Sequence, residues 1–130
     1  MAVNPIWVNI MDNCFAKTFL AEYSDCNPLI LNDKENFELL LMNFFRNSHK
    51  IIHNSNFISY SKGLLGTIYT ENKIITITSY IENRSVLVDI LSFDPDLNLI
   101  KFFNQIKAVI KSKYFLTMEI KRLPNLNKTI

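Results

Sequence analysis

Apolar side chains recur every three or four positions in two parts of the chain, which predicts two helices. The first is predicted over residues 29–45, where Asn32 or Asp33 can cap its second half. The second is predicted to start at Asp94-Pro95-Asp96, because the apolar residues between positions 99 and 110 form a single stripe. Both segments therefore bury one face and leave the other to solvent.

Between these helices the spacing of apolar residues shortens, and β-branched residues become frequent. Short polar clusters such as Glu71-Asn72-Lys73 and Glu82-Asn83-Arg84 divide this region at close intervals, as in an antiparallel meander. The predicted strands are residues 15–23, 51–60, 64–70, 74–81, 85–92 and 114–120.

This order predicts an α+β fold, in which two helices pack on one face of an antiparallel sheet. We expect one domain over residues 1–130, with an irregular arm at 1–12 and a polar tail at 121–130. Ile74 and Ile75 place apolar side chains on both faces of their strand. A second layer should therefore cover the other face, and a dimer that buries the region of residues 74–81 would supply it.

Composition narrows the class of protein without assigning a function. The chain has 130 residues, is 48% hydrophobic and 20% charged, and carries a net charge of +2. This charge is too small to favour nucleic acid or an anionic membrane as a partner, and no apolar run reaches the length of a membrane span. Two cysteines and no secretory signal predict a cytoplasmic protein. Two glycines, Gly63 and Gly66, fit no phosphate-binding loop.

No local catalytic or metal-binding motif stands out. His49 and His53 are four residues apart but have no third ligand nearby, so we interpret them as solvated or capping side chains. Cys14 and Cys26 do not form a CxxC pair and are read as small buried residues. A basic edge on the last helix is interpreted as a solvated face; it consists of Lys107, Lys111 and Lys113.

Several segments, taken in order, resemble the small prokaryotic type of S-adenosylmethionine decarboxylase. Leu20-Ala21-Glu22-Tyr23 followed by Cys26 is similar to the opening strand of that family. The stretch from Gly66 to Asp89 is similar to its central meander, with Thr76-Ile77, Ser79-Tyr80, Glu82 and Val88-Asp89 in matching positions. Ile51-Ile52, Ser55 and Phe57 fit the strand between them, and Lys101-Phe102-Phe103 and Ile106-Lys107-Ala108 fit the last helix.

The resemblance implies a pyruvoyl enzyme of polyamine (spermidine) biosynthesis whose active site lies near a dimer interface. In that family a precursor cleaves itself before a serine, which becomes a pyruvoyl group that forms a Schiff base with the substrate. A second serine and a histidine assist cleavage, and a cysteine donates a proton. Here these four positions, in the same order, hold Lys73, Leu65, Thr78 and Phe93.

None of the four replacements can supply the missing chemistry. An amine at position 73 cannot form the ester that precedes a pyruvoyl group, and Leu65 and Phe93 transfer no protons. We therefore expect no pyruvoyl cofactor, no metal, no self-processing and no decarboxylation.

The residues at the positions that bind the nucleoside in the family match the family better than those at the catalytic positions do. By the resemblance, Tyr60 would stack on adenine, Glu82 would hold the ribose hydroxyls and the backbone of Ile75 would meet the adenine edge. Alternatively, Tyr60 is a core residue and Glu82 a turn residue.

We expect a protein that acts by binding, either as a homodimer or as a heterodimer with an active paralogue, with an adenosyl-type molecule as a candidate ligand. The alternatives are an enzyme of changed chemistry on an S-adenosyl or amine substrate, in which Lys73 is a nucleophile or base, and an interaction module without a small ligand.

Overall fold

A computed structural model describes residues 16–48, 51–94 and 99–122 of the chain. These residues form six strands in the predicted order and three helices, where two were predicted. The elements are β1 (Ala16–Ser24), α2 (Pro28–Asn32), α3 (Lys34–Ser48), β2 (Ile52–Tyr60), β3 (Gly63–Thr70), β4 (Lys73–Tyr80), β5 (Ser85–Ser92), α4 (Ile100–Ile110) and β6 (Tyr114–Arg122).

All six strands form one antiparallel sheet in the order β2-β3-β4-β5-β1-β6. The strands from β2 to β5 are consecutive in the sequence and adjacent in the sheet, so the predicted meander is confirmed. The first strand of the chain, β1, is inserted between β5 and β6. It pairs with both neighbours along most of its length, which ties the two ends of the described chain together.

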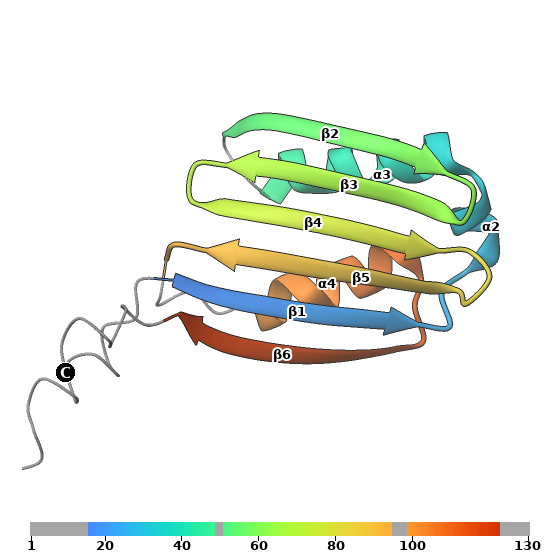
Figure 1. Cartoon of the computed structure of the whole chain (residues 1–130). Coiled ribbons are helices and arrows are strands. Elements are labelled where there is room, and N and C mark those ends of the chain that lie inside the picture. Colours follow the sequence, from blue (N-terminus) through green and yellow to red (C-terminus); the bar gives the residue numbers. More distant parts are fainter. Residues whose placement is uncertain (1–15, 49–50, 95–98, 123–130) are drawn as a thin grey trace, which may run out of the picture.

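Helices α3 and α4 lie side by side on one face of the sheet, and the hydrophobic core fills the space between the two layers (Figure 1). The core includes alternate residues of the strands, because successive side chains of a strand point to opposite faces of the sheet. Its largest fully buried side chains are Tyr23, Phe37, Phe45, Phe103, Leu31, Leu41, Ile68, Ile75, Ile77, Ile90, Ile106 and Ile110. The predicted α+β class, with helices on one face of an antiparallel sheet, is confirmed.

The single helix predicted over residues 29–45 is instead two helices that meet at Asp33. The backbone of Asp33 leaves the helical region, with ψ at 82°, and this ends α2. Its side chain then accepts a hydrogen bond from the backbone N–H of Asn36, at 3.3 Å, and so caps α3. The capping role predicted for Asn32 or Asp33 thus belongs to Asp33, and the same residue interrupts the helix.

Several predicted boundaries shift by one to three residues, and others fall outside the described residues. Helix α4 begins at Ile100, after Leu99, whereas residues 95–98 of its predicted start are not described. Strand β6 continues to Arg122, which is two residues beyond its predicted end. The predicted arm at residues 1–12, and the tail from 123 onward, lie outside the described part. Within that part, none of the helices is long and apolar enough to cross a membrane.

Candidate functional site

Tyr60 and Glu82 are brought to the same end of the sheet by two neighbouring turns. Tyr60 ends β2, and Glu82 lies in the turn between β4 and β5. The two turns are linked directly, because the backbone N–H of Ile81 donates a hydrogen bond to the carbonyl oxygen of Lys62 at 2.9 Å. An aromatic ring and a carboxylate predicted to bind a nucleoside therefore share one edge of the molecule.

The side chain of Tyr60 is held in place and half-buried. Its hydroxyl donates to the backbone carbonyl oxygen of Ser79, at 2.9 Å, and its own carbonyl oxygen accepts a hydrogen bond from the ammonium group of Lys34. Burial, with a smaller effect of neighbouring Tyr80, raises the pKa of the Tyr60 phenol. Glu82, in contrast, is exposed. The ring is thus fixed by the fold, while the carboxylate faces solvent.

Ile75 does not join these two residues. Its side chain is fully buried in the core, and its backbone lies within the sheet, opposite Ile68 on one side and Ile90 on the other. Along β4 it is five residues from Tyr80, a separation of about 17 Å in a strand. Within one copy of the chain, the Ile75 backbone therefore lies too far from Tyr60 and Glu82 to contact the same adenine ring.

Two of the four positions that hold catalytic residues in S-adenosylmethionine decarboxylases, the family that the sequence resembles, lie directly opposite each other. Leu65 on β3 pairs with Thr78 on β4. Both side chains belong to the face of the sheet that α3 and α4 do not cover, and Leu65 is 38% exposed. The register therefore brings these positions together, but the pair offers one hydroxyl and one alkyl group.

The other two positions, Lys73 and Phe93, meet at the far end of β4. The backbone N–H of Phe93 donates to the carbonyl oxygen of Asn72 at 2.9 Å, and Lys73 pairs with Ser92. The Lys73 ammonium donates to the side-chain oxygen of Asn72 at 3.1 Å. Burial lowers the pKa of Lys73, and the carboxylate of Asp94 acts in the opposite direction. Phe93 is about half exposed.

The face of the sheet that the helices leave uncovered carries many exposed apolar side chains, and we call it the open face. It consists of the strand side chains that alternate with the core residues. Its most exposed large apolar members, each at least 38% exposed, are Ile58, Leu65, Tyr69, Tyr80, Leu87, Tyr114, Leu116, Met118 and Ile120. Monomeric proteins seldom expose contiguous apolar patches of more than a few hundred Å². The expectation that apolar side chains occupy both faces is confirmed, since Ile75 is in the core and Ile74 is on the open face.

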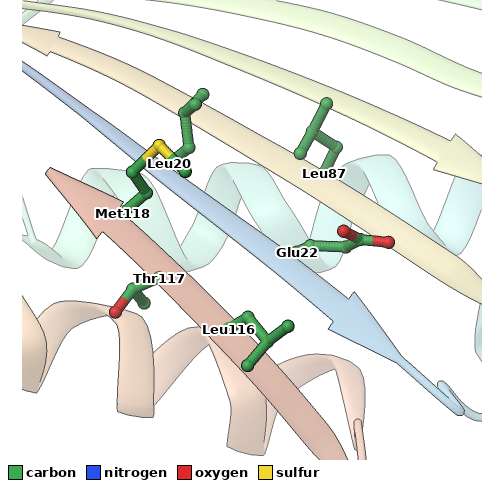
Figure 2. A pocket seen from close by; sticks show the side chains of 6 residues that line it. All are labelled: Leu20, Glu22, Leu87, Leu116, Thr117 and Met118. Atoms are coloured by element: carbon green, nitrogen blue, oxygen red, sulfur yellow. The ribbon is translucent and has the colours of Figure 1, made fainter. Parts of the chain in front are cut away.

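A hollow of about 380 Å³ lies on the open face, where β5, β1 and β6 run side by side. Leu20, Leu87, Leu116 and Met118 line this hollow together with Glu22, whose carboxylate points away from Leu20 and Met118 (Figure 2). Beyond the family resemblance, nothing in the sequence assigns a role to Glu22. The alternation of β1 was visible in the sequence, but the face that the helices leave bare was not.

The histidine, cysteine and lysine side chains considered in the sequence lie in surroundings typical of surface or core residues. His53 is exposed on β2, and His49 lies outside the described residues. Cys26 is a buried free thiol. Lys107 lies over the ring of Phe115 at 5.7 Å, and Lys113 forms an ion pair with Asp25 at 3.5 Å, in keeping with a solvated basic edge. Among the described residues, no group of three or more His, Cys, Asp or Glu side chains could hold a metal ion.

Comparisons with known proteins agree with this fold. The family model described as S-adenosylmethionine decarboxylase matches residues 17–123. The solved structure of the adenosylmethionine decarboxylase from Aquifex aeolicus is similar in fold, with a TM-score of 0.73 and 13% sequence identity. The match covers 87% of this chain and 94% of that one. The search of curated proteins found no match. Because the family model spans most of the chain, this protein belongs to the S-adenosylmethionine decarboxylase family.

Proposed function

We propose that this protein is a member of the polyamine-biosynthesis decarboxylase family that neither cleaves itself nor decarboxylates, and that it acts by binding. The observation that carries the proposal is the identity of the side chains at the four family positions, Leu65, Lys73, Thr78 and Phe93. Self-cleavage requires a hydroxyl or thiol that attacks the preceding carbonyl group. Lys73 has neither, and the residue before it, Asn72, uses its side-chain oxygen to accept a hydrogen bond from Lys73.

The geometry around these positions supports the same conclusion. Thr78 faces Leu65 across the strand pair, so its hydroxyl has no second polar group at the position directly opposite. Phe93 presents a ring where the family has a proton donor, and a ring cannot transfer a proton. One restored residue would therefore be insufficient for activity.

The proposed function is to bind a second protein of this family, either another copy or an active paralogue, and to modulate it. The support is the open face, whose exposed side chains include Leu116 at 76% and Met118 at 57%. Covering such a face removes apolar surface from water, which is the main driving force of protein association. A cytoplasmic location is part of the proposal, in keeping with the free thiol of Cys26.

We further propose that an adenosyl-type ligand binds at the sheet end that holds Tyr60 and Glu82. The ring of Tyr60 would add about 1 kcal/mol of stacking, and Glu82 would add charge-assisted hydrogen bonds to ribose hydroxyls. Binding would be reversible, because no pyruvoyl group is available to form a covalent link. Phe93 lies at the opposite end of β4 and would not contact a ligand bound there.

Mass spectrometry of the purified protein tests the loss of self-processing. We expect one species near 15.2 kDa, because residue 73 is lysine. The Lys73→Ser variant should also remain whole, since Leu65 and Thr78 still lack the assisting groups. Two fragments that meet between Asn72 and Lys73 in the unmodified protein would refute the proposal.

Calorimetry tests the ligand. Titration with S-adenosylmethionine and with 5′-methylthioadenosine should give weak binding that Glu82→Ala reduces and Glu22→Gln leaves unchanged. The absence of binding at millimolar concentration, or equal binding by Glu82→Ala, would show that Tyr60 and Glu82 have only structural roles.

A second candidate function is an enzyme of changed chemistry on an S-adenosyl or amine substrate. The observation that favours it is the lowered pKa of Lys73, which increases the fraction of neutral amine available as a nucleophile or base. Turnover of S-adenosylmethionine by the unmodified protein, lost in Lys73→Met, would support this alternative and refute the first proposal.

A further inference from the structure

The exposure of the open face falls toward the end of the sheet at which β1 begins. On this face of β1, Glu22 is exposed, whereas Thr18 is only 5% exposed. Ala16, the first residue of the strand, is fully buried. On the neighbouring β6, exposure decreases in the same direction, from 76% at Leu116 to 38% at Ile120. This end of the open face is therefore more enclosed, although α3 and α4 lie on the other face (Figure 1).

The neighbouring strands alone do not account for the burial of Thr18. It is flanked by Leu91 on β5 and by Ile120 on β6. Thr78 occupies an equivalent position on the same face, since it is flanked by a leucine on β3 and a leucine on β5. Two large aliphatic neighbours leave Thr78 half-buried, whereas Thr18 is almost inaccessible. The additional cover over Thr18 therefore comes from outside the sheet.

The chain before β1 has the composition that such a cover requires. Residues 1–11 carry no charged side chain, and five of the six residues at positions 6–11, which we call the apolar segment, are apolar: Ile6, Trp7, Val8, Ile10 and Met11. The chain from this segment enters β1 at Ala16, at the most enclosed end of the face. Positions 6–11 are at least five residues from Ala16, a reach of about 17 Å in an extended chain, whereas Thr18 is about 7 Å from Ala16 along the strand.

The other undescribed segments at this end of the sheet fit less well. Residues 123–130 follow β6, which is an edge strand, and four of these eight residues are polar or charged. Cover from that side would enclose Ile120 most, but Ile120 is still 38% exposed and Thr18 on the inner strand is not. Residues 95–98 connect β5 to α4, which lies on the opposite face (Figure 1).

We propose that the apolar segment packs on the open face of its own chain, over Thr18 and its cross-strand neighbours Leu91 and Ile120. The contact removes apolar surface of both the segment and the sheet from water, which is the main driving force of such packing. Trp7 contributes most, because an aromatic side chain buries about 150–250 Å². The absence of charge from the segment means that no ionised group is desolvated with it.

The proposed cover divides the open face into two parts. It lies at the end of the sheet that holds Lys73 and Phe93. The opposite end, with Leu116 and the turns of Tyr60 and Glu82, stays accessible. The inference therefore goes beyond the proposed function and does not depend on it, because a partner and a ligand bind at the accessible end.

Fluorescence of the intact chain tests the inference, since Trp7 is its single tryptophan. The constant for acrylamide quenching should be at least threefold smaller in the native protein than in the same protein unfolded in urea, because a packed indole is shielded. It should stay the same when the native protein is diluted fiftyfold, since the contact lies within one chain. Equal quenching in the native and unfolded protein, or protection that disappears on dilution, would overturn the inference.

A matched pair of variants tests the location of the contact. Leu91→Asn and Leu87→Asn make the same change on the same face of β5, beside Thr18 and beside Glu22, respectively. Leu91→Asn should raise the quenching constant of Trp7 at least twofold, and Leu87→Asn should leave it unchanged. Ile120→Asn takes the place of Leu91→Asn if the latter lacks the native circular dichroism spectrum. The inference is overturned if both changes raise the constant equally, or if neither raises it.

Discussion

The hydroxyl of Tyr60 donates to the backbone oxygen of Ser79 at 2.9 Å, and so links β2 to β4 although β3 lies between them. Gly63 of β3 is directly opposite Tyr60. A Cβ atom at Gly63 would lie 1.9 Å from the same Ser79 oxygen. The fixed position of the Tyr60 ring at the candidate ligand site thus depends on a close approach of three strands.

Tyr60→Phe should remove this link while keeping the ring. We expect the free energy of unfolding to fall by about 0.5–1.5 kcal/mol, the usual net contribution of one hydrogen bond. Urea denaturation measures the change. Because stacking on a ligand needs only the ring, adenosyl-ligand binding should stay within threefold of the unmodified protein. A large loss of binding with unchanged stability would assign the hydroxyl, rather than the ring, to the ligand.

Gly63→Ala should destabilise the protein more than Tyr60→Phe does. The added methyl group would collide with backbone atoms of Ser79, which cannot move without disturbing the pairing of β3 with β4. Overpacking of this kind typically costs about 1–3 kcal/mol. The midpoint of urea denaturation should fall accordingly, and a midpoint equal to that of the unmodified protein would show that this end of the sheet relaxes freely.

Tyr23 should make the stability of the protein fall at alkaline pH. Its hydroxyl donates to the carbonyl oxygen of Phe103 at 2.8 Å in the core, and burial, followed by the effect of Cys26, raises its pKa. The native state therefore holds this proton after the unfolded chain has released it, which happens near pH 10. Stability from this group is present below that pH and is lost above it.

Comparison with Tyr23→Phe isolates this effect, because Tyr60 and Cys26 remain in both proteins. At pH 8 the variant should be less stable by about 0.5–1.5 kcal/mol, since one buried hydrogen bond is lost while the Phe103 oxygen keeps a backbone partner within α4. Between pH 8 and pH 11 the difference should shrink, as followed by urea denaturation at each pH. A difference that stays constant over this range would contradict the assignment.

Lys73 should act in the opposite direction over a similar range of pH. Because burial lowers its pKa, the native state releases this proton before the unfolded chain does. Stability should therefore rise with pH between the native pKa and the usual value of 10.5. Lys73→Met should lose this rise, measured as the urea midpoint at pH 7 and at pH 10 relative to the unmodified protein. An identical rise in the variant would mean that other groups cause it.

The sequence was sufficient for most of the elements, because the features that specify them are local. Side-chain alternation and the polar clusters around Asn72 and Asn83 set the strands of the meander, which pair with their neighbours in the sequence. The break between α2 and α3 was missed, since Asp33 can either cap a helix or interrupt one. Its backbone conformation decides between these roles, and the apolar period alone does not.

For the candidate site, the sequence determined which residue types are available, and the tertiary structure determined which of them meet. The proposed loss of the family chemistry rests on the side-chain types of Lys73, Leu65 and Phe93 alone, which are read from the sequence. Tyr60 and Glu82 come together only because two turns are adjacent, and Ile75 is separated from them because it lies in the middle of β4.

The surroundings of Glu22 depend on contacts between strands far apart in the chain. Alternation gives every strand two faces, but only the packing of α3 and α4 decides which face remains open and leaves this carboxylate among leucines.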